Sequence, residues 1–171
     1  MKSDGVIVPL KELDEFETRV YESTKYLGMD GKPESWDIDI SRANLRFEYA
    51  TRGPPARVSY RLFVTPNMTN RLGNLHGGCA ATLIDNLSTT ILIGVSRPGI
   101  FQYGGVSRNL NVTYLRPVPL DTEIRVICEV VHVGRRLALL KAEIRRVDND
   151  ELCVIADHQK ANTDPDSNQK L

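Results

Sequence analysis

The chain has 171 residues, a length that a single domain can fill, and its 41% of hydrophobic residues are enough to build a core. Its 22 Lys and Arg residues balance 22 Asp and Glu residues, so the formal net charge at pH 7 is zero. This balance excludes an overall basic field that would attract nucleic acid or an anionic membrane. The three cysteines are odd in number and lie in apolar segments, which favours core residues in a reducing compartment over a disulfide framework.

The first 35 residues are expected to form an N-terminal extension with one amphipathic helix from about Pro9 to Leu27. A turn through residues 28–33 follows, because Gly28 supplies a stop signal. The N-terminus lacks both the apolar core of a secretory signal and the Arg-rich composition of a transit peptide. We therefore expect a cytoplasmic protein and leave the mitochondrion open. The apolar stripe of the helix consists of Leu10, Leu13, Phe16, Val20 and Leu27.

A hairpin and a long helix are expected next. Extended segments at residues 44–51 and 56–65 are joined by a turn at residues 52–55 that contains two prolines. A loop then leads to an apolar helix at about residues 77–95, which Pro98 and Gly99 terminate. This apolar run contains Asp85 and several other polar residues, so it is not expected to span a membrane.

In the second half of the chain, the hydrophobic pattern changes from that of a helix to that of strands. Residues 105–115, 123–132, 136–147 and 152–162 are rich in Val, Ile and Leu, have strand length and are separated by turn signals. The sequence therefore predicts an α+β domain over residues 36–163, in which an antiparallel sheet of about six strands wraps one long central helix. Residues 164–171 are polar and are expected to form a flexible tail.

A carboxylate in the middle of the apolar helix is the most informative feature of the chain. Burying Asp85 is costly unless a partner pairs with it or a reaction uses it. Small or polar residues flank it on one helical face, whereas Leu83, Leu87 and Ile91 lie on the other. We expect a second copy of the chain to approach this small-residue face and bury Asp85; the alternative is an Asp that simply pairs with an Arg or caps a neighbouring element. The flanking residues are Ala81, Thr82, Ser88 and Thr89.

The motifs around this helix resemble the hotdog-fold acyl-CoA thioesterases, specifically the branch of acyl-CoA thioesterase 13-like and phenylacetate-pathway thioesterases. The resemblance implies the hotdog fold, an acyl-CoA substrate, and a homodimer or homotetramer with active sites between protomers. It implies no cofactor. The matching residues are Asn70, the triplet His76-Gly77-Gly78, Asp85-Asn86, Gly105-Val106-Ser107, Asn111-Val112-Thr113-Tyr114 and Pro117.

Thioester hydrolysis needs a positioned water, a base or nucleophile, and donors for the developing oxyanion. Gly77 has no side chain and lies at the positive end of the helix dipole, so its N–H is our oxyanion-hole candidate. The resemblance implies that Asp85 of the facing subunit acts as base or nucleophile. It also implies that Ser107 orients the water or the carboxylate, and that Asn70 and His76 position the thioester.

Coenzyme A carries phosphates, so its groove needs cations. Arg135 and Arg136 follow Gly134 at a tight turn, next to His132. The resemblance implies a basic residue near this turn that holds the nucleotide. The expected substrate-binding set is Gly78, Tyr114, His132, Arg135, Arg136 and Lys160. The histidines show no metal-ligand spacing with Cys or acidic residues, so no metal is expected.

Three other functions remain open at this point. A hotdog dehydratase or hydratase would also act on acyl thioesters, but the helix segment resembles thioesterases more closely. A non-catalytic module that binds or senses acyl-CoA would keep the fold and the groove without needing Asp85. A purely structural oligomer would show no affinity for acyl-CoA, which a thermal-shift titration can measure.

Overall fold

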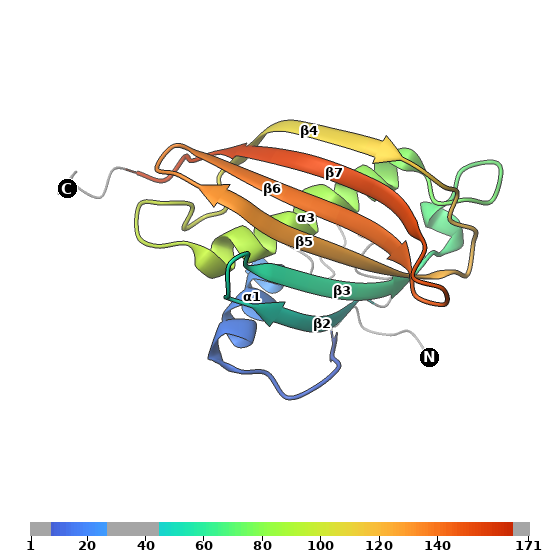
Figure 1. Ribbon diagram of the computed structural model, residues 1–171, viewed down its shortest axis with the longest axis horizontal. Helices are drawn as coiled ribbons and strands as arrows, with labels where there is room; N and C mark the ends of the chain where they lie inside the picture. Colours follow the sequence, from blue (N-terminus) through green and yellow to red (C-terminus); the bar gives the residue numbers. More distant parts are fainter. Residues whose placement is uncertain (1–7, 27–44, 166–171) are drawn as a thin grey trace.

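The computed structural model describes residues 8–26 and 45–165. Its strands form one sheet in the order β1-β2-β3-β5-β6-β7-β4, antiparallel apart from the two-residue β1. Figure 1 shows this sheet curving over α3, with β4 along one edge. The elements are β1 (Val8–Pro9), α1 (Glu15–Tyr26), β2 (Arg46–Thr51), β3 (Arg57–Phe63), the short 3-10 helix η1 (Pro66–Met68), α3 (Gly77–Val95), β4 (Val106–Tyr114), β5 (Glu123–Val133), β6 (Leu137–Arg146) and β7 (Leu152–Ala161).

The predicted architecture is confirmed, because a long helix lies against an antiparallel sheet as in a hotdog fold. Leu83, Leu87 and Ile91 of α3 are fully buried, as their shared helical face predicts. The central strands bury alternate residues, and in β5 these are Ile124, Val126 and Cys128. Among the described residues, α3 is long and apolar enough to cross a membrane, but its role here is that of the core helix beneath the sheet.

The N-terminal helix begins later than the sequence analysis expected. α1 starts at Glu15, and Leu10 lies outside it with 44% of its surface exposed. Asp14 Oδ1 accepts a hydrogen bond from Glu17 N at 2.8 Å, while Asp14 N donates to Glu17 Oε2 at 3.3 Å. This reciprocal pair is a capping box and fixes the helix start. The expected turn at residues 28–33, the residue Leu27 and the domain boundary after residue 35 lie outside the described residues.

α1 packs against the C-terminal half of α3. Gly94 allows this approach, because a Cβ there would lie 2.5 Å from Val20 Cγ2. Arg19 Nη2 donates to the carbonyl oxygen of Ser96 at 2.9 Å and to its hydroxyl at 3.0 Å, which satisfies acceptors at the end of α3. The extension therefore covers α3 on the side that the sheet leaves open. Of the expected tail, Asp164 accepts hydrogen bonds from the N–H groups of Gln102 and Tyr103, and residues 166–171 lie outside the described part of the chain.

β4 is an open edge. Within the described part of the chain it pairs only with β7, so its other side presents unpaired backbone groups. Its nine residues are mostly exposed, and they include the large apolar side chains Val106 and Tyr114, each 53% exposed. A long edge strand of this kind is suited to pairing with another strand.

Candidate functional site

Asp85 lies in the middle of α3 and faces β4. Ser107 Oγ donates to Asp85 Oδ1 at 2.6 Å, a short bond typical of a hydroxyl that donates to a carboxylate. The Asp85 side chain is 39% exposed in the single chain, so the expected burial is incomplete without a partner. Its second oxygen, Oδ2, has no hydrogen-bond partner among the described residues. The carboxylate is thus held through one oxygen and open at the other.

A fully buried histidine lies beneath this pair. His158 of β7 places Nε2 at 3.0 Å from Ser107 Oγ and 3.3 Å from Asp85 Oδ1. Its Nδ1 lies 2.7 Å from Ser88 Oγ. Burial and the nearby Lys160 lower the pKa of His158 to about 4, and Asp85 opposes that shift only in part. The imidazole is therefore neutral near pH 7.

Lys160 is also buried, two residues further along β7. Its Nζ donates to Thr89 Oγ1 at 2.8 Å, and Thr89 Oγ1 donates to the backbone carbonyl of Asp85 at 2.8 Å. Burial lowers the pKa of Lys160, and Asp85 opposes the shift. Only 4% of Lys160 is exposed, which argues against the expected contact with coenzyme A phosphates. Ser88 and Thr89 likewise face β7 of their own chain, so only part of the small-residue face is left for a second copy.

Gly77 begins α3 and has a free backbone donor. His76 is the N-cap residue, and its Nδ1 accepts a hydrogen bond from Gly78 N at 3.0 Å. Gly78 is thereby engaged, whereas the Gly77 N–H has no acceptor in the part of the chain that the structure describes. Tyr114 Oη donates to the Gly77 carbonyl at 2.8 Å, and a Cβ on Gly77 would lie 3.1 Å from the Tyr114 ring. Tyr114 packs directly against Gly77, so a larger residue there would require the tyrosine ring to shift.

The loop before α3 lines a groove beside Gly77. Asn70 Oδ1 accepts hydrogen bonds from Leu72 N at 2.9 Å and from Asn74 N at 3.2 Å, so this side chain shapes the loop. A hollow of about 480 Å³ is lined by Asn70, Gly77 and Tyr114, together with the apolar residues Leu75, Ala80 and Val118. The structure therefore brings the expected residues Asn70, Gly77 and Tyr114 to one place.

Asp85 and Gly77 form two separate half-sites within one chain. Eight residues along an α-helix correspond to a rise of about 12 Å. A thioester carbonyl that accepts from Gly77 N–H therefore cannot lie next to Asp85 of the same chain. Ser107 joins the Asp85 half-site, and Tyr114 joins the Gly77 half-site.

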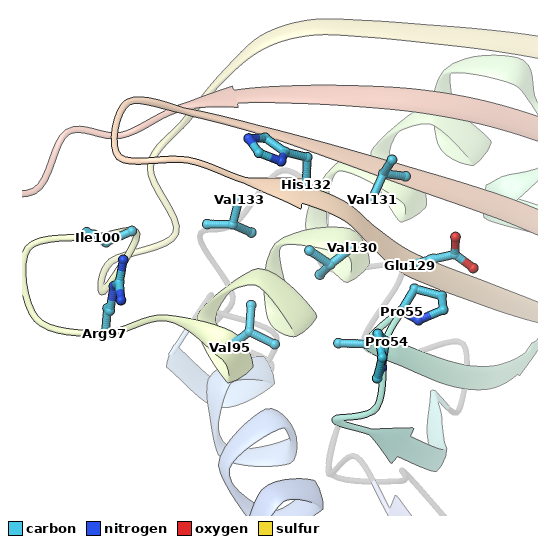
Figure 2. A pocket seen from close by; sticks show the side chains of 11 residues that line it. Pro54, Pro55, Val95, Arg97, Ile100, Glu129, Val130, Val131, His132 and Val133 are labelled. Carbon is cyan, nitrogen blue, oxygen red and sulfur yellow. The ribbon is translucent and has the colours of Figure 1, made fainter.

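The expected cations lie at the hairpin between β5 and β6. Arg135 and Arg136 are exposed at this turn, and a register shift between Val130 and His132 leaves His132 exposed as well. Figure 2 shows a hollow at the C-terminal end of α3, with Val95, Val130 and Val133 among its lining residues. This hollow of about 840 Å³ also includes His132 in its lining. Among the described residues, no group of three or more His, Cys, Asp or Glu side chains could hold a metal ion.

The place of His158 in this cluster was not predicted from the sequence, where this histidine had been interpreted only as a possible metal ligand. Strand periodicity carried a usable signal. Val154, Ala156, His158 and Lys160 alternate along β7 and are all buried, so they share the face that covers α3. A histidine in that inward series has to find polar partners on the helix, and Ser88 is such a partner.

Comparisons with known proteins identify the family and the fold. The sequence pattern of the family described as "Thioesterase superfamily" matches residues 72–153. Acyl-coenzyme A thioesterase 13 of Homo sapiens is 33% identical over 106 residues, which cover 62% of this chain and 73% of that protein. The crystal structure of zebrafish thioesterase superfamily member 2 superposes with a TM-score of 0.69 at 26% identity, covering 84% of this chain and 97% of the other.

A hypothetical thioesterase from Streptococcus pneumoniae, solved with coenzyme A, has a TM-score of 0.65 at 22% identity. It covers 84% of this chain and 96% of the other, and it supports the fold. The predicted family and the predicted hotdog architecture are both confirmed. The chain belongs to the thioesterase superfamily and is a thioester hydrolase.

Proposed function

We propose that the protein hydrolyses acyl-CoA thioesters at a site shared by two copies of the chain. The observation that carries this proposal is the pair of half-sites on α3, one with a carboxylate and one with a free backbone donor. Neither half can hydrolyse a thioester alone, since the reaction needs a base and an oxyanion donor at one carbonyl. The relatives named acyl-coenzyme A thioesterase supply the substrate class.

The open edge of β4 supplies the means to join the halves. Ser107 near its start contacts Asp85, and Tyr114 at its end contacts Gly77. A two-fold axis through the middle of β4, near Leu110 and Asn111, would pair this strand with its copy and exchange the two ends. Gly77 of one copy would then approach Asp85 of the other, and two equivalent sites would form in each dimer.

In the proposed reaction, the Gly77 N–H polarises the thioester carbonyl. Asp85 of the other copy takes a proton from water through Oδ2 while the water oxygen bonds to the carbonyl carbon. The oxyanion of the tetrahedral intermediate is stabilised by Gly77 N–H and the helix dipole. The intermediate collapses with cleavage of the C–S bond, and the thiolate recovers the proton from Asp85. The products are a free acid and coenzyme A.

We assign Asp85 the role of general base rather than nucleophile. The bond from Ser107 engages Oδ1 at 2.6 Å, and Oδ2 has no hydrogen-bond partner among the described residues, in a side chain that is 39% exposed. A single turnover in ¹⁸O-labelled water tests for the nucleophilic route, because water that opens an acyl–Asp85 anhydride at the Asp85 carbonyl leaves its label in that carboxylate. The general-base route puts ¹⁸O into the product acid and none into Asp85.

The nucleotide end of coenzyme A is assigned to the hairpin between β5 and β6. Arg136 is exposed there, and guanidinium groups bind phosphates through paired donors. Arg135 and His132 lie on the same hairpin and extend the basic surface. Tyr114 and Gly78 border the expected path of the pantetheine arm at the start of α3.

The test is the release of free thiol from a panel of short, medium, long and aromatic acyl-CoAs. Asp85→Asn should lose most of the turnover while keeping the fold and the affinity for acyl-CoA. Asp157→Asn is a matched control, because Asp157 is an exposed carboxylate next to His158 on β7 and should be silent. Undiminished turnover in Asp85→Asn would remove this residue from the mechanism. Binding of acyl-CoA without any turnover would favour the non-catalytic binding module instead.

A further inference from the structure

A line of four polar side chains connects the core of the protein to the open carboxylate. Ser88 of α3, His158 of β7, Ser107 of β4 and Asp85 of α3 are linked by contacts of 2.7, 3.0 and 2.6 Å. His158 and Ser88 are both 0% exposed. Buried polar groups of this kind are costly unless every donor and acceptor is satisfied.

The proton positions along this line follow from the carboxylate of Asp85 at one end of it. A carboxylate oxygen can only accept, so the hydrogen of the Ser107 hydroxyl points to Asp85 Oδ1. Ser107 Oγ has then used its one hydrogen, and it accepts from His158 Nε2 at 3.0 Å. A neutral imidazole that carries its proton on Nε2 has a bare Nδ1, which accepts from the Ser88 hydroxyl at 2.7 Å.

The other acceptor near Ser88 is a weaker alternative. The backbone carbonyl of Asp85 lies 3.4 Å from Ser88 Oγ, which is longer than the contact to His158. The charged groups that face the imidazole are Asp85 from α3 and Lys160 from β7. The buried ammonium of Lys160 disfavours a second positive charge on His158, and its own bond to Thr89 holds it beside the cluster.

We propose that Ser88 and His158 are positioning residues that act through Ser107. In this assignment, Ser88 selects the Nε2–H tautomer of His158. That tautomer denies Ser107 any acceptor other than Asp85 Oδ1, and Ser107 then holds the carboxylate with Oδ2 directed to the attacking water. That this water attacks a thioester rests on the proposed function. The arrangement of the four side chains does not depend on the proposed function.

The arrangement can be tested without activity. In the full-length protein labelled with ¹⁵N-histidine, the two ring nitrogens of His158 report the tautomer by NMR. A signal of the neutral Nε2–H tautomer at pH 7 is expected in the wild type and in Ser107→Ala. The signal is assigned to His158 because it should be absent from His158→Gln. Ser88→Ala should lower the population of the Nε2–H tautomer. A protonated Nδ1 at pH 7 in the wild type, alone or together with Nε2, would overturn the proposal.

Kinetics test whether the line acts through Ser107. Ser88→Ala and His158→Gln should each lower kcat for an acyl-CoA roughly 3- to 10-fold, the scale of one hydrogen bond, with KM unchanged. His158→Gln keeps a donor near Nε2 and should retain more turnover than His158→Leu. In a Ser107→Ala background, neither Ser88→Ala nor His158→Gln should lower kcat further, because the intermediary is gone.

Thr90→Val is a matched control for the loss of a buried hydroxyl. Thr90 accepts from Tyr60 Oη at 2.9 Å and makes no contact with the line, so Thr90→Val should lower stability and leave kcat unchanged. Additive effects of His158→Gln and Ser107→Ala on kcat would refute action through Ser107. If the wild type releases no thiol from any acyl-CoA while the NMR signal matches the expected tautomer, the proposed function fails and the arrangement stands.

Discussion

Acidification should destabilise the fold through His158. This side chain is fully buried, and its pKa falls from 6.5 to about 4 on folding. Between these two values the unfolded chain binds a proton that the folded protein does not bind, so the free energy of unfolding decreases as the pH falls. Below pH 4 both states are protonated and the loss levels off.

The size of this effect follows from the shift. Each pH unit below 6.5 costs about 1.4 kcal/mol, so His158 should remove about 2 kcal/mol of stability between pH 7 and pH 5. Near pH 4 the loss should reach about 3 kcal/mol, since the folded protein begins to bind the proton there.

The assay is urea unfolding at pH 7, 6 and 5 at one fixed protein concentration, because a dimer would make stability depend on concentration. His158→Gln is the matched variant, since glutamine does not titrate and all other groups remain. The variant is expected to be less stable at pH 7 but to lose about 2 kcal/mol less than the wild type between pH 7 and pH 5. Equal losses in the two proteins would refute a neutral buried His158.

Three further perturbations test the packing and the substrate contacts. Gly94→Ala should lower the free energy of unfolding by roughly 1–3 kcal/mol in urea, because its Cβ would lie 2.5 Å from Val20 Cγ2; an unchanged midpoint would contradict the packing of α1 on α3. Asp14→Ala should cost about 1 kcal/mol through the lost cap, and no cost would contradict the capping box. Arg136→Ala should raise KM for acyl-CoA but not for the N-acetylcysteamine thioester of the same acid, and Arg146→Ala is the control; equal effects on both substrates would contradict a phosphate contact.

The strands and the central helix could be predicted because their residues repeat with clear periods. Alternation in β5 and the stripe of Leu83, Leu87 and Ile91 both match the observed burial. The predicted start of α1, near Pro9, was wrong by several residues. Leu10 fits the helical stripe, but the capping box of Asp14 and Glu17 overrides that period and begins the helix at Glu15.

The residues of the predicted motifs lie in two half-sites, but the side chains that they contact belong to other helices and strands. Contacts such as Ser107 with Asp85 join positions 22 residues apart, and His158 with Ser88 joins positions 70 apart. A motif indicates such residues by type, whereas the register of β4 and β7 over α3 decides which of them meet. Lys160 shows the same limit, because its charge suggested a phosphate contact and its inward position on β7 buries it instead.

The shared site is tested most directly by complementation between two inactive variants. Asp85→Asn and Gly77→Val should each be nearly inactive alone. When the two chains are co-expressed, half of the dimers should be hybrids, and each hybrid should contain one site with both Gly77 and Asp85 intact. The account predicts about a quarter of the wild-type turnover per chain. A co-expressed mixture no more active than either variant alone would contradict a site built from two copies.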